Sequence, residues 1–164
     1  MKKGYKTGIF MVVIFLIAGY IYYTFPQNVN VIYSGIKYQL GDLTQQEQIE
    51  IRISGHYYKR LFATDFFKGS INIENKNYPN LKLLVGEEVQ LVAYRDYKEN
   101  GKLYTYGEAF IGEKLVNLTI CVQDEKNGWN SEDGFMVSAP AKNRFEALKI
   151  SNGLMKDFLK HKLE

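Results

Sequence analysis

The sequence predicts an α+β protein: an N-terminal transmembrane helix, a mainly antiparallel β domain and a C-terminal amphipathic helix. Three observations lead to this fold class. Residues 7–25 carry no charge, the middle of the chain alternates apolar and polar residues, and the apolar residues of the last segment fall at helical spacing. A period of two is typical of half-buried strands, and a period near 3.6 is typical of amphipathic helices.

The transmembrane helix is expected over residues 8–25. The 17 residues of 9–25 reach roughly 26 Å, close to the ~30 Å hydrocarbon core, so the segment can span a bilayer together with its flanking residues. A cleaved signal peptide would end near the small pair Ala18 and Gly19. Aromatic and apolar residues continue past this pair, which favours an uncleaved anchor; cleavage near Gly19 remains the alternative.

The charges on either side of this segment predict its orientation. Lys2, Lys3 and Lys6 precede it, and the first basic residue after it is Lys37. The positive-inside rule therefore places the N-terminus in the cytoplasm and the bulk of the chain outside a single-pass cell-membrane anchor. The expected organisation is a cytoplasmic tail (1–7), the transmembrane helix (8–25), a short linker (26–30) and an extracytoplasmic β domain with its C-terminal helix (31–164).

The outer part of the chain is close to neutral. Removing the three lysines before the span from the 21 Lys and Arg leaves 18, equal to the 18 Asp and Glu. This balance argues against nucleic acid as a partner, because nucleic-acid binders carry a basic face. About 139 residues suffice for one domain with a real core. Cys121 is the only cysteine, so it forms no intrachain disulfide, and its apolar surroundings predict a buried thiol.

The absence of disulfides and the abundance of Lys, Asn, Ile and Tyr resemble the usage of low-G+C Gram-positive bacteria. The layout is similar to that of the many uncharacterised small membrane-anchored proteins of such bacteria. This resemblance covers the whole chain loosely and carries no motif, so it implies a location and assigns no role to any residue.

The β domain is expected to contain about six to eight strands, curled into a sandwich or a partial barrel. In the clearest strand Ile49, Ile51 and Ile53 face one side while charged residues face the other. Asn100 and Gly101 lie between two alternating runs, which is the strongest short-range signal for a hairpin. Gly35, in the middle of the first run, is expected to mark a bulge.

A helix is expected over about 141–161, with Pro140 well placed before its start. Ser151, Asn152 and Gly153 weaken its middle, so one long helix and two short ones are both compatible with the sequence. The favoured interpretation is that its apolar face packs on the sheet. The alternative is that this mildly basic helix lies on an anionic membrane surface.

No motif in the sequence predicts catalysis, a metal or a cofactor, because HExxH, CxxC, GxSxG and phosphate-loop patterns are all missing. His56 and Asp65 could form an acid–base pair, although a histidine beside tyrosines is usually a half-exposed strand residue. The acidic loop from Asp124 to Asp133 does not have the spacing of a calcium-binding EF-hand. The prediction is therefore a protein that is not an enzyme.

The expected ligand-binding residues are Trp129, Tyr94, Tyr104 and Tyr106. The three tyrosines belong to the predicted hairpin and can share one face of it. Trp129, the only tryptophan, lies among turn residues, where it can act as a platform for a ligand. Two other interpretations stay open: ordinary cross-strand pairing of the tyrosines, and a Trp129 that folds back as a lid over the end of the barrel.

Two classes of function are compatible with these features. The first is a membrane-tethered module that binds a cell-surface or cell-wall ligand through the aromatic residues. The second is an accessory subunit that docks on another membrane protein, favoured by the very short linker. An enzyme without a recognisable motif is a weaker third hypothesis. The expected partners are membrane lipid around residues 8–25 and either a cell-wall polymer or a membrane protein.

Overall fold

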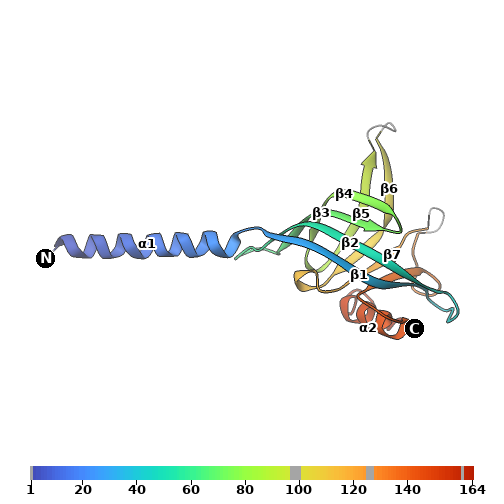
Figure 1. Ribbon diagram of the computed structural model, residues 1–164. Helices are drawn as coiled ribbons and strands as arrows, with labels where there is room; N and C mark the ends of the chain where they lie inside the picture. Colours follow the sequence, from blue (N-terminus) through green and yellow to red (C-terminus); the bar gives the residue numbers. More distant parts are fainter. Residues whose placement is uncertain (1, 97–100, 125–127, 160) are drawn as a thin grey trace.

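The computed structural model describes residues 2–96, 101–124, 128–159 and 161–164, with side chains for all of these except 2–7, 87–88 and 95–96. Eight antiparallel strands form one sheet in the order β4-β3-β2-β1-β8-β7-β6-β5 (Figure 1). This confirms the expected β domain of six to eight strands. The strands are β1 (Gln27–Gln39), β2 (Gln46–Tyr58), β3 (Phe66–Ile73), β4 (Lys76–Leu84), β5 (Gly86–Asp96), β6 (Lys102–Ile111), β7 (Leu118–Val122) and β8 (Phe135–Ala139).

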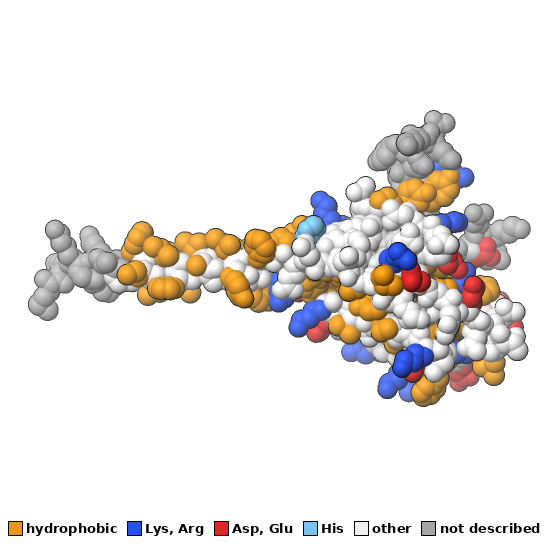
Figure 2. Space-filling model, viewed as in Figure 1, with side chains coloured by type: hydrophobic (Ala, Val, Ile, Leu, Met, Phe, Trp, Pro, Cys, Tyr) orange, Lys and Arg blue, Asp and Glu red, His pale blue; other side chains and the backbone are white. Residues whose placement is uncertain are grey.

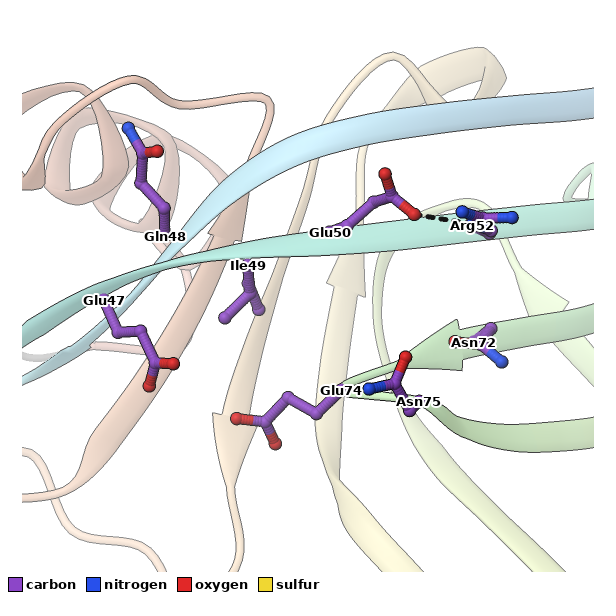
Figure 3. Close-up of a pocket in the computed structure, with 8 residues that line it drawn as sticks. All are labelled: Glu47, Gln48, Ile49, Glu50, Arg52, Asn72, Glu74 and Asn75. Carbon is purple, nitrogen blue, oxygen red and sulfur yellow. Dashed lines mark hydrogen bonds and ion pairs between the residues drawn. The ribbon is translucent and has the colours of Figure 1, made fainter.

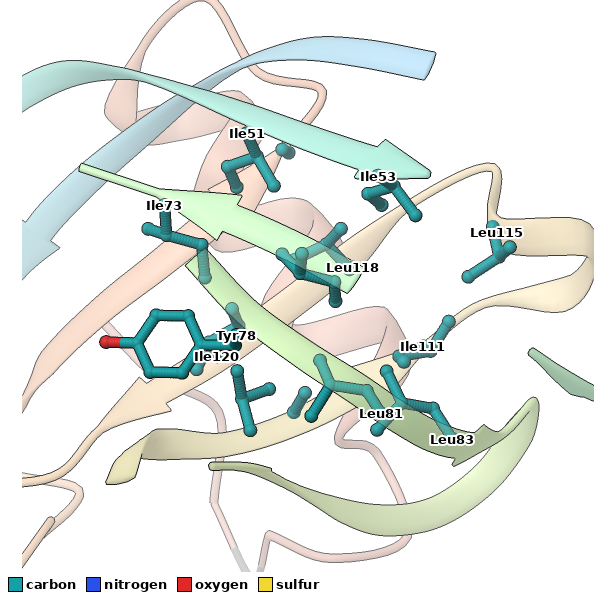
Figure 4. Close-up of a cluster of buried hydrophobic side chains, with 14 of the residues drawn as sticks. Ile51, Ile53, Ile73, Tyr78, Leu81, Leu83, Ile111, Leu115, Leu118 and Ile120 are labelled. Atoms are coloured by element: carbon teal, nitrogen blue, oxygen red, sulfur yellow. The ribbon is translucent and has the colours of Figure 1, made fainter. Parts of the chain in front are cut away.

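The sheet curls into a nearly closed barrel whose two edge strands, β4 and β5, are consecutive in the chain. Alternate side chains of the strands point inward and form one apolar core (Figure 4). Ile51, Ile53 and Ile120 at its centre are completely buried. Because side chains fill the interior, a ligand can approach this barrel only at its ends or on its outside.

Two glycines allow β2 and β3 to approach closely. Gly55 and Gly69 are register partners, and a Cβ on either one would overlap the backbone of the other strand. Gly35 has a different role from the one expected, because the pairing of β1 with β2 runs through it without a bulge. A Cβ at Gly35 would lie 2.9 Å from the side chain of Ala139 and 2.9 Å from the Ser138 carbonyl oxygen, so this glycine lets β1 approach the end of β8 closely.

Helix α2 (Arg144–Leu154) packs on the outer face of β1, β7 and β8, as the amphipathic pattern predicts. The helix is shorter than the expected 141–161 and does not begin at Pro140. Asn143 is its N-cap and accepts a hydrogen bond from the Glu146 amide at 2.9 Å. The Glu146 carboxylate in turn accepts from the Lys142 amide at 2.9 Å. These two hydrogen bonds, which resemble a capping box, set the start of the helix.

A buried group of hydroxyls joins α2 to the sheet. The Ser151 Oγ lies 2.7 Å from the Tyr38 hydroxyl, 2.8 Å from Thr119 Oγ1 and 2.7 Å from Ser138 Oγ. An apolar layer surrounds these hydroxyls and includes Cys121, whose thiol is buried as expected. Burial raises the pKa of this thiol to about 12, with a further contribution from Glu108. The polar contacts fix the position of α2 along the strands.

Helix α1 (Lys2–Thr24) projects away from the barrel (Figure 1). In the described part of the chain no helix has both the length and the apolar character needed to cross a membrane, so the structure does not support the transmembrane assignment of residues 8–25. The expected linker 26–30 is also corrected. Strand β1 begins at Gln27 and pairs with Tyr57 of β2, so the chain passes from helix to sheet within two residues.

Candidate functional site

The β5–β6 hairpin brings the predicted tyrosines together. Tyr94 and Tyr104 are cross-strand partners, and their rings stack with centroids 5.2 Å apart and planes 15° apart. The ring of Tyr78, on β4, meets Tyr94 edge-on at 5.8 Å and Tyr106 edge-on at 5.7 Å. These four residues form a continuous tyrosine cluster at the end of the barrel away from α1.

Tyr78 was not expected at this site, because the sequence analysis did not identify β4 as a strand. Pro79 interrupts this segment, and a proline argues against a central strand. β4 is an edge strand, where proline is tolerated, and Asn80 adopts a positive φ of 58° that shifts the alternation. Tyr78, Leu81 and Leu83 are consequently all buried although their spacing is irregular.

The tyrosine cluster borders a cleft of about 430 Å³, here called the hairpin cleft. It lies between the start of β4, the β5–β6 hairpin and the residues that follow β7. The Lys102 ammonium lies 4.9 Å above the ring centroid of Tyr104, a favourable cation–π contact. The cleft therefore combines aromatic walls with charged groups of both signs. Its lining residues are Lys76, Tyr78, Tyr94, Lys102, Leu103, Tyr104, Thr105, Gln123 and Asp124.

Tyr106 lies behind this cleft and is held by charged neighbours. Its hydroxyl donates to Glu74 Oε2 at 3.3 Å, and Lys37 Nζ lies 2.6 Å from Glu74 Oε1. Burial first, and then the Glu74 carboxylate, raise the pKa of Tyr106 far above its usual value. Burial also raises the pKa of Tyr78. Both hydroxyls are therefore protonated at neutral pH and able to donate hydrogen bonds.

A second and larger hollow, of about 570 Å³, lies on β2 and the β3–β4 turn (Figure 3). Glu47, Glu50 and Glu74 point into or along it, and Arg52 pairs with Glu50 at 2.5 Å. The wall is polar and open to solvent, with Ile49 as its apolar member. Within the described residues no group of three His, Cys, Asp or Glu side chains is placed to hold a metal ion. The hairpin cleft is the better-built site, because it has aromatic walls.

Trp129 lies elsewhere. Its ring packs against the apolar layer under α2, and Gly134 lies directly at the edge of the indole. Its indole N–H is buried without a hydrogen-bond partner among the described residues. Trp129 is not among the residues that line the hairpin cleft. It folds back onto the protein, but over the outer layer under α2 and not over the end of the barrel.

The acid–base pair considered for His56 and Asp65 is not formed. Asp65 Oδ2 accepts a hydrogen bond from the Tyr57 hydroxyl at 2.6 Å, and Oδ1 accepts from the Arg60 amide at 2.8 Å. His56 is exposed on β2, beside the ring of Tyr58 at a centroid distance of 6.3 Å. Both carboxylate oxygens of Asp65 are thus hydrogen-bonded to Tyr57 and Arg60 and not to His56.

No protein-family model, curated protein sequence or solved structure matches the chain. The class of protein is accordingly defined by fold and site: a nearly closed, eight-stranded antiparallel barrel with one outer helix and a tyrosine-lined cleft. The role of each residue follows from the geometry of this chain alone.

Proposed function

We propose that this chain is a non-enzymatic binding module that holds a cell-surface or cell-wall ligand in the hairpin cleft, at the outer face of a membrane. The observation that carries the proposal is the cleft itself, with three tyrosines and two lysines around about 430 Å³. Ligand pockets in proteins commonly enclose 300–1,000 Å³ and combine apolar walls with a few convergent polar groups.

The lining of the cleft suits a polymer that has both apolar faces and polar substituents. Tyr94 and Tyr104 offer ring edges for contact with a sugar or a peptide segment. Lys76 and Lys102 can meet an anionic group, and Asp124 can accept hydrogen bonds from hydroxyl or amide groups. A carbohydrate or peptide segment of a cell-wall polymer has this chemistry.

Membrane attachment through α1 is part of the proposal. The large apolar side chains from Ile9 to Ile21 are all exposed, and they cover the helix on several sides (Figure 2). Exposed apolar surface of this extent is costly in water, and a bilayer would cover it. The lysines that precede the segment in sequence favour a cytoplasmic N-terminus and an extracytoplasmic barrel.

A second function, an accessory subunit of another membrane protein, is favoured by a separate observation. Only two residues, Phe25 and Pro26, separate α1 from β1. This connection holds the barrel close to the end of the helix, where a partner in the same membrane would meet it. In that case residues 8–25 recognise a protein, and exchanging them for an unrelated apolar segment would abolish function.

Co-sedimentation of the full-length protein in detergent with isolated cell-wall material tests the binding proposal. The Tyr94→Ala/Tyr104→Ala double variant should lose most of the retention shown by the parent protein. Tyr58→Ala is a matched control, since it removes a stacked tyrosine (4.6 Å from the Phe66 ring) near the other end of the barrel. Circular dichroism verifies that each variant is folded.

The Trp129→Phe variant distinguishes the two binding surfaces that the sequence suggested, the hairpin tyrosines and Trp129. Under the present proposal this variant keeps the retention of the parent protein, because Trp129 lies outside the hairpin cleft. Retention that depends on Trp129 and not on the tyrosines would move the site to the surroundings of Trp129. Failure of the folded parent protein to bind wall material would leave the accessory-subunit function.

A further inference from the structure

The loop between β2 and β3, residues 59–65, lies beside the end of α1 (Figure 1). Lys59 Nζ is 5.6 Å from the ring centroid of Tyr23, the penultimate residue of the helix. At the tip of this β2–β3 loop, Leu61 is 48% exposed and Phe62 is 97% exposed. The apolar surface of α1 thus continues onto the barrel at this loop.

Hydrogen bonds hold the β2–β3 loop in its shape. Asp65 binds the Arg60 amide and the Tyr57 hydroxyl, and Arg60 Nε donates to the Thr64 carbonyl at 2.7 Å. The Asp65 carbonyl accepts from the Val85 amide at 2.9 Å, which joins the loop to the β4–β5 connection. An ordered loop therefore presents two apolar side chains to solvent, an arrangement that the hydrophobic effect disfavours unless another surface covers them.

Basic residues surround the apolar tip. Lys59 and Arg60 precede it, and the Arg60 guanidinium and the Lys82 ammonium each lie 5.2 Å from the Phe66 ring. Lys114, on the turn between β6 and β7, adds a further positive charge, and its backbone is hydrogen-bonded to Tyr57 beside the loop. Among the side chains that the structure describes, two acidic ones lie in this region: Asp65, whose carboxylate is already hydrogen-bonded, and Glu113 on the same turn. Within this described set the basic side chains are in excess, which favours an anionic partner.

We propose that the β2–β3 loop is a second membrane contact, in which Leu61 and Phe62 enter the headgroup–acyl boundary while Lys59 and Arg60 bind anionic lipid headgroups. The inference rests on the proposed attachment of α1 to a membrane and deepens it. Continuity with α1 and the surrounding positive charge identify the occupant as an anionic lipid surface. A helix and a loop on the same bilayer hold the barrel at a fixed tilt, with the hairpin cleft facing away from the membrane.

Tryptophan quenching by brominated lipids tests this contact in the full-length protein. Trp129→Phe removes the native fluorophore, and Phe62→Trp then places one at the tip of the loop. Leu43→Trp is the matched control: Leu43 is exposed on the β1–β2 turn, about 40 Å away along the 13 residues of β1. Both variants are reconstituted into phosphatidylcholine–phosphatidylglycerol vesicles, and flotation first verifies that the protein is attached.

If the inference is correct, brominated acyl chains cause a roughly twofold loss of emission at position 62 and none at position 43, as expected for a side chain at the acyl boundary. Quenching at position 62 should weaken in vesicles of phosphatidylcholine alone. If brominated lipid quenches positions 62 and 43 equally, in vesicles that float with the protein, the loop contact is overturned and the attachment of α1 is left intact. A protein that does not float would overturn the membrane attachment itself.

Discussion

The tyrosine cluster at one end of the barrel and Phe62 at the other end differ in how far their rings are packed. At the distal end, away from α1, the rings of Tyr78, Tyr94 and Tyr106 pack on one another beside the hairpin cleft. At the proximal end, beside α1, Phe62 lies almost completely in solvent. The distal rings therefore contribute to the core as well as to the cleft, whereas Phe62 contributes little to folding.

This difference separates two kinds of recognition. A cleft whose walls are also part of the core is preorganised. It can therefore enclose a segment of ligand without the entropic cost of ordering its own side chains. An apolar tip on an ordered loop encloses nothing and suits a broad surface. The same sequence thus offers a pocket at one end and a surface contact at the other, and mutations can separate them.

The largest expected effect contrasts Tyr78→Ala with Phe62→Ala. Tyr78 is buried against two rings, so its truncation should lower the free energy of unfolding by about 3–5 kcal/mol. Phe62→Ala removes an exposed ring and should change this free energy by less than about 0.5 kcal/mol. Denaturant unfolding of the β domain, followed by circular dichroism, measures both. Similar values for the two variants would mean that the tyrosine cluster is no better packed than the exposed Phe62.

A smaller loss is expected for Tyr57→Phe, which affects the shape of the proximal loop. The Tyr57 hydroxyl donates to the Asp65 carboxylate at 2.6 Å, and a hydrogen bond to a charged group contributes about 1.5–3 kcal/mol. Amide exchange at Arg60 should also accelerate, because Asp65 holds that amide. Tyr58→Phe keeps its ring stacked on Phe66 and serves as the control. An equal cost for the two variants would show that the hydrogen bond does not stabilise the loop.

Much of this architecture was predictable from local patterns in the sequence. The alternation of Ile49, Ile51 and Ile53 correctly indicates an inward-facing strand, and the Asn100–Gly101 signal correctly pairs Tyr94 with Tyr104. Residues 97–100, where the turn of this hairpin is expected, lie outside the described residues. Local periodicity is sufficient here because a hairpin joins neighbours in sequence.

Features that depend on distant contacts were not predictable. β4 was missed because Pro79 is acceptable only on an edge, and which strand lies at the edge is a property of the whole sheet. With β4, Tyr78 was missed as the link between the hairpin tyrosines. The position of Trp129 under α2 depends on how a polar loop folds back, for which no periodic signal exists. The start of α2 was misplaced because Asn143 and Glu146 cap it, not Pro140.

Alkaline pH should weaken the distal end through Tyr106. Its folded-state pKa is raised by burial and by Glu74, so its contribution to stability is complete below the unfolded pKa of about 10 and is lost as the pH rises above it. The loss amounts to about 1.4 kcal/mol per pH unit for one such tyrosine. Tyr106→Phe should therefore reduce the slope of unfolding free energy against pH between pH 10 and 11. Burial also raises the pKa of four other tyrosines: Tyr33, Tyr38, Tyr57 and Tyr78. An unchanged slope would assign the alkaline sensitivity to these residues.

The smallest expected effect concerns the ion pair behind the cleft. Lys37 and Glu74 are 24% and 33% exposed, so Glu74→Gln should cost about 0.5–1 kcal/mol, and high salt should reduce this difference. Glu50→Gln is the matched control, since Glu50 and Arg52 are more than half exposed and their pair should contribute close to nothing. Glu74 also accepts from the Tyr106 hydroxyl, so its replacement should weaken retention of wall material as well. A loss of stability without a loss of retention would mean that Glu74 supports the barrel and leaves the cleft unaffected.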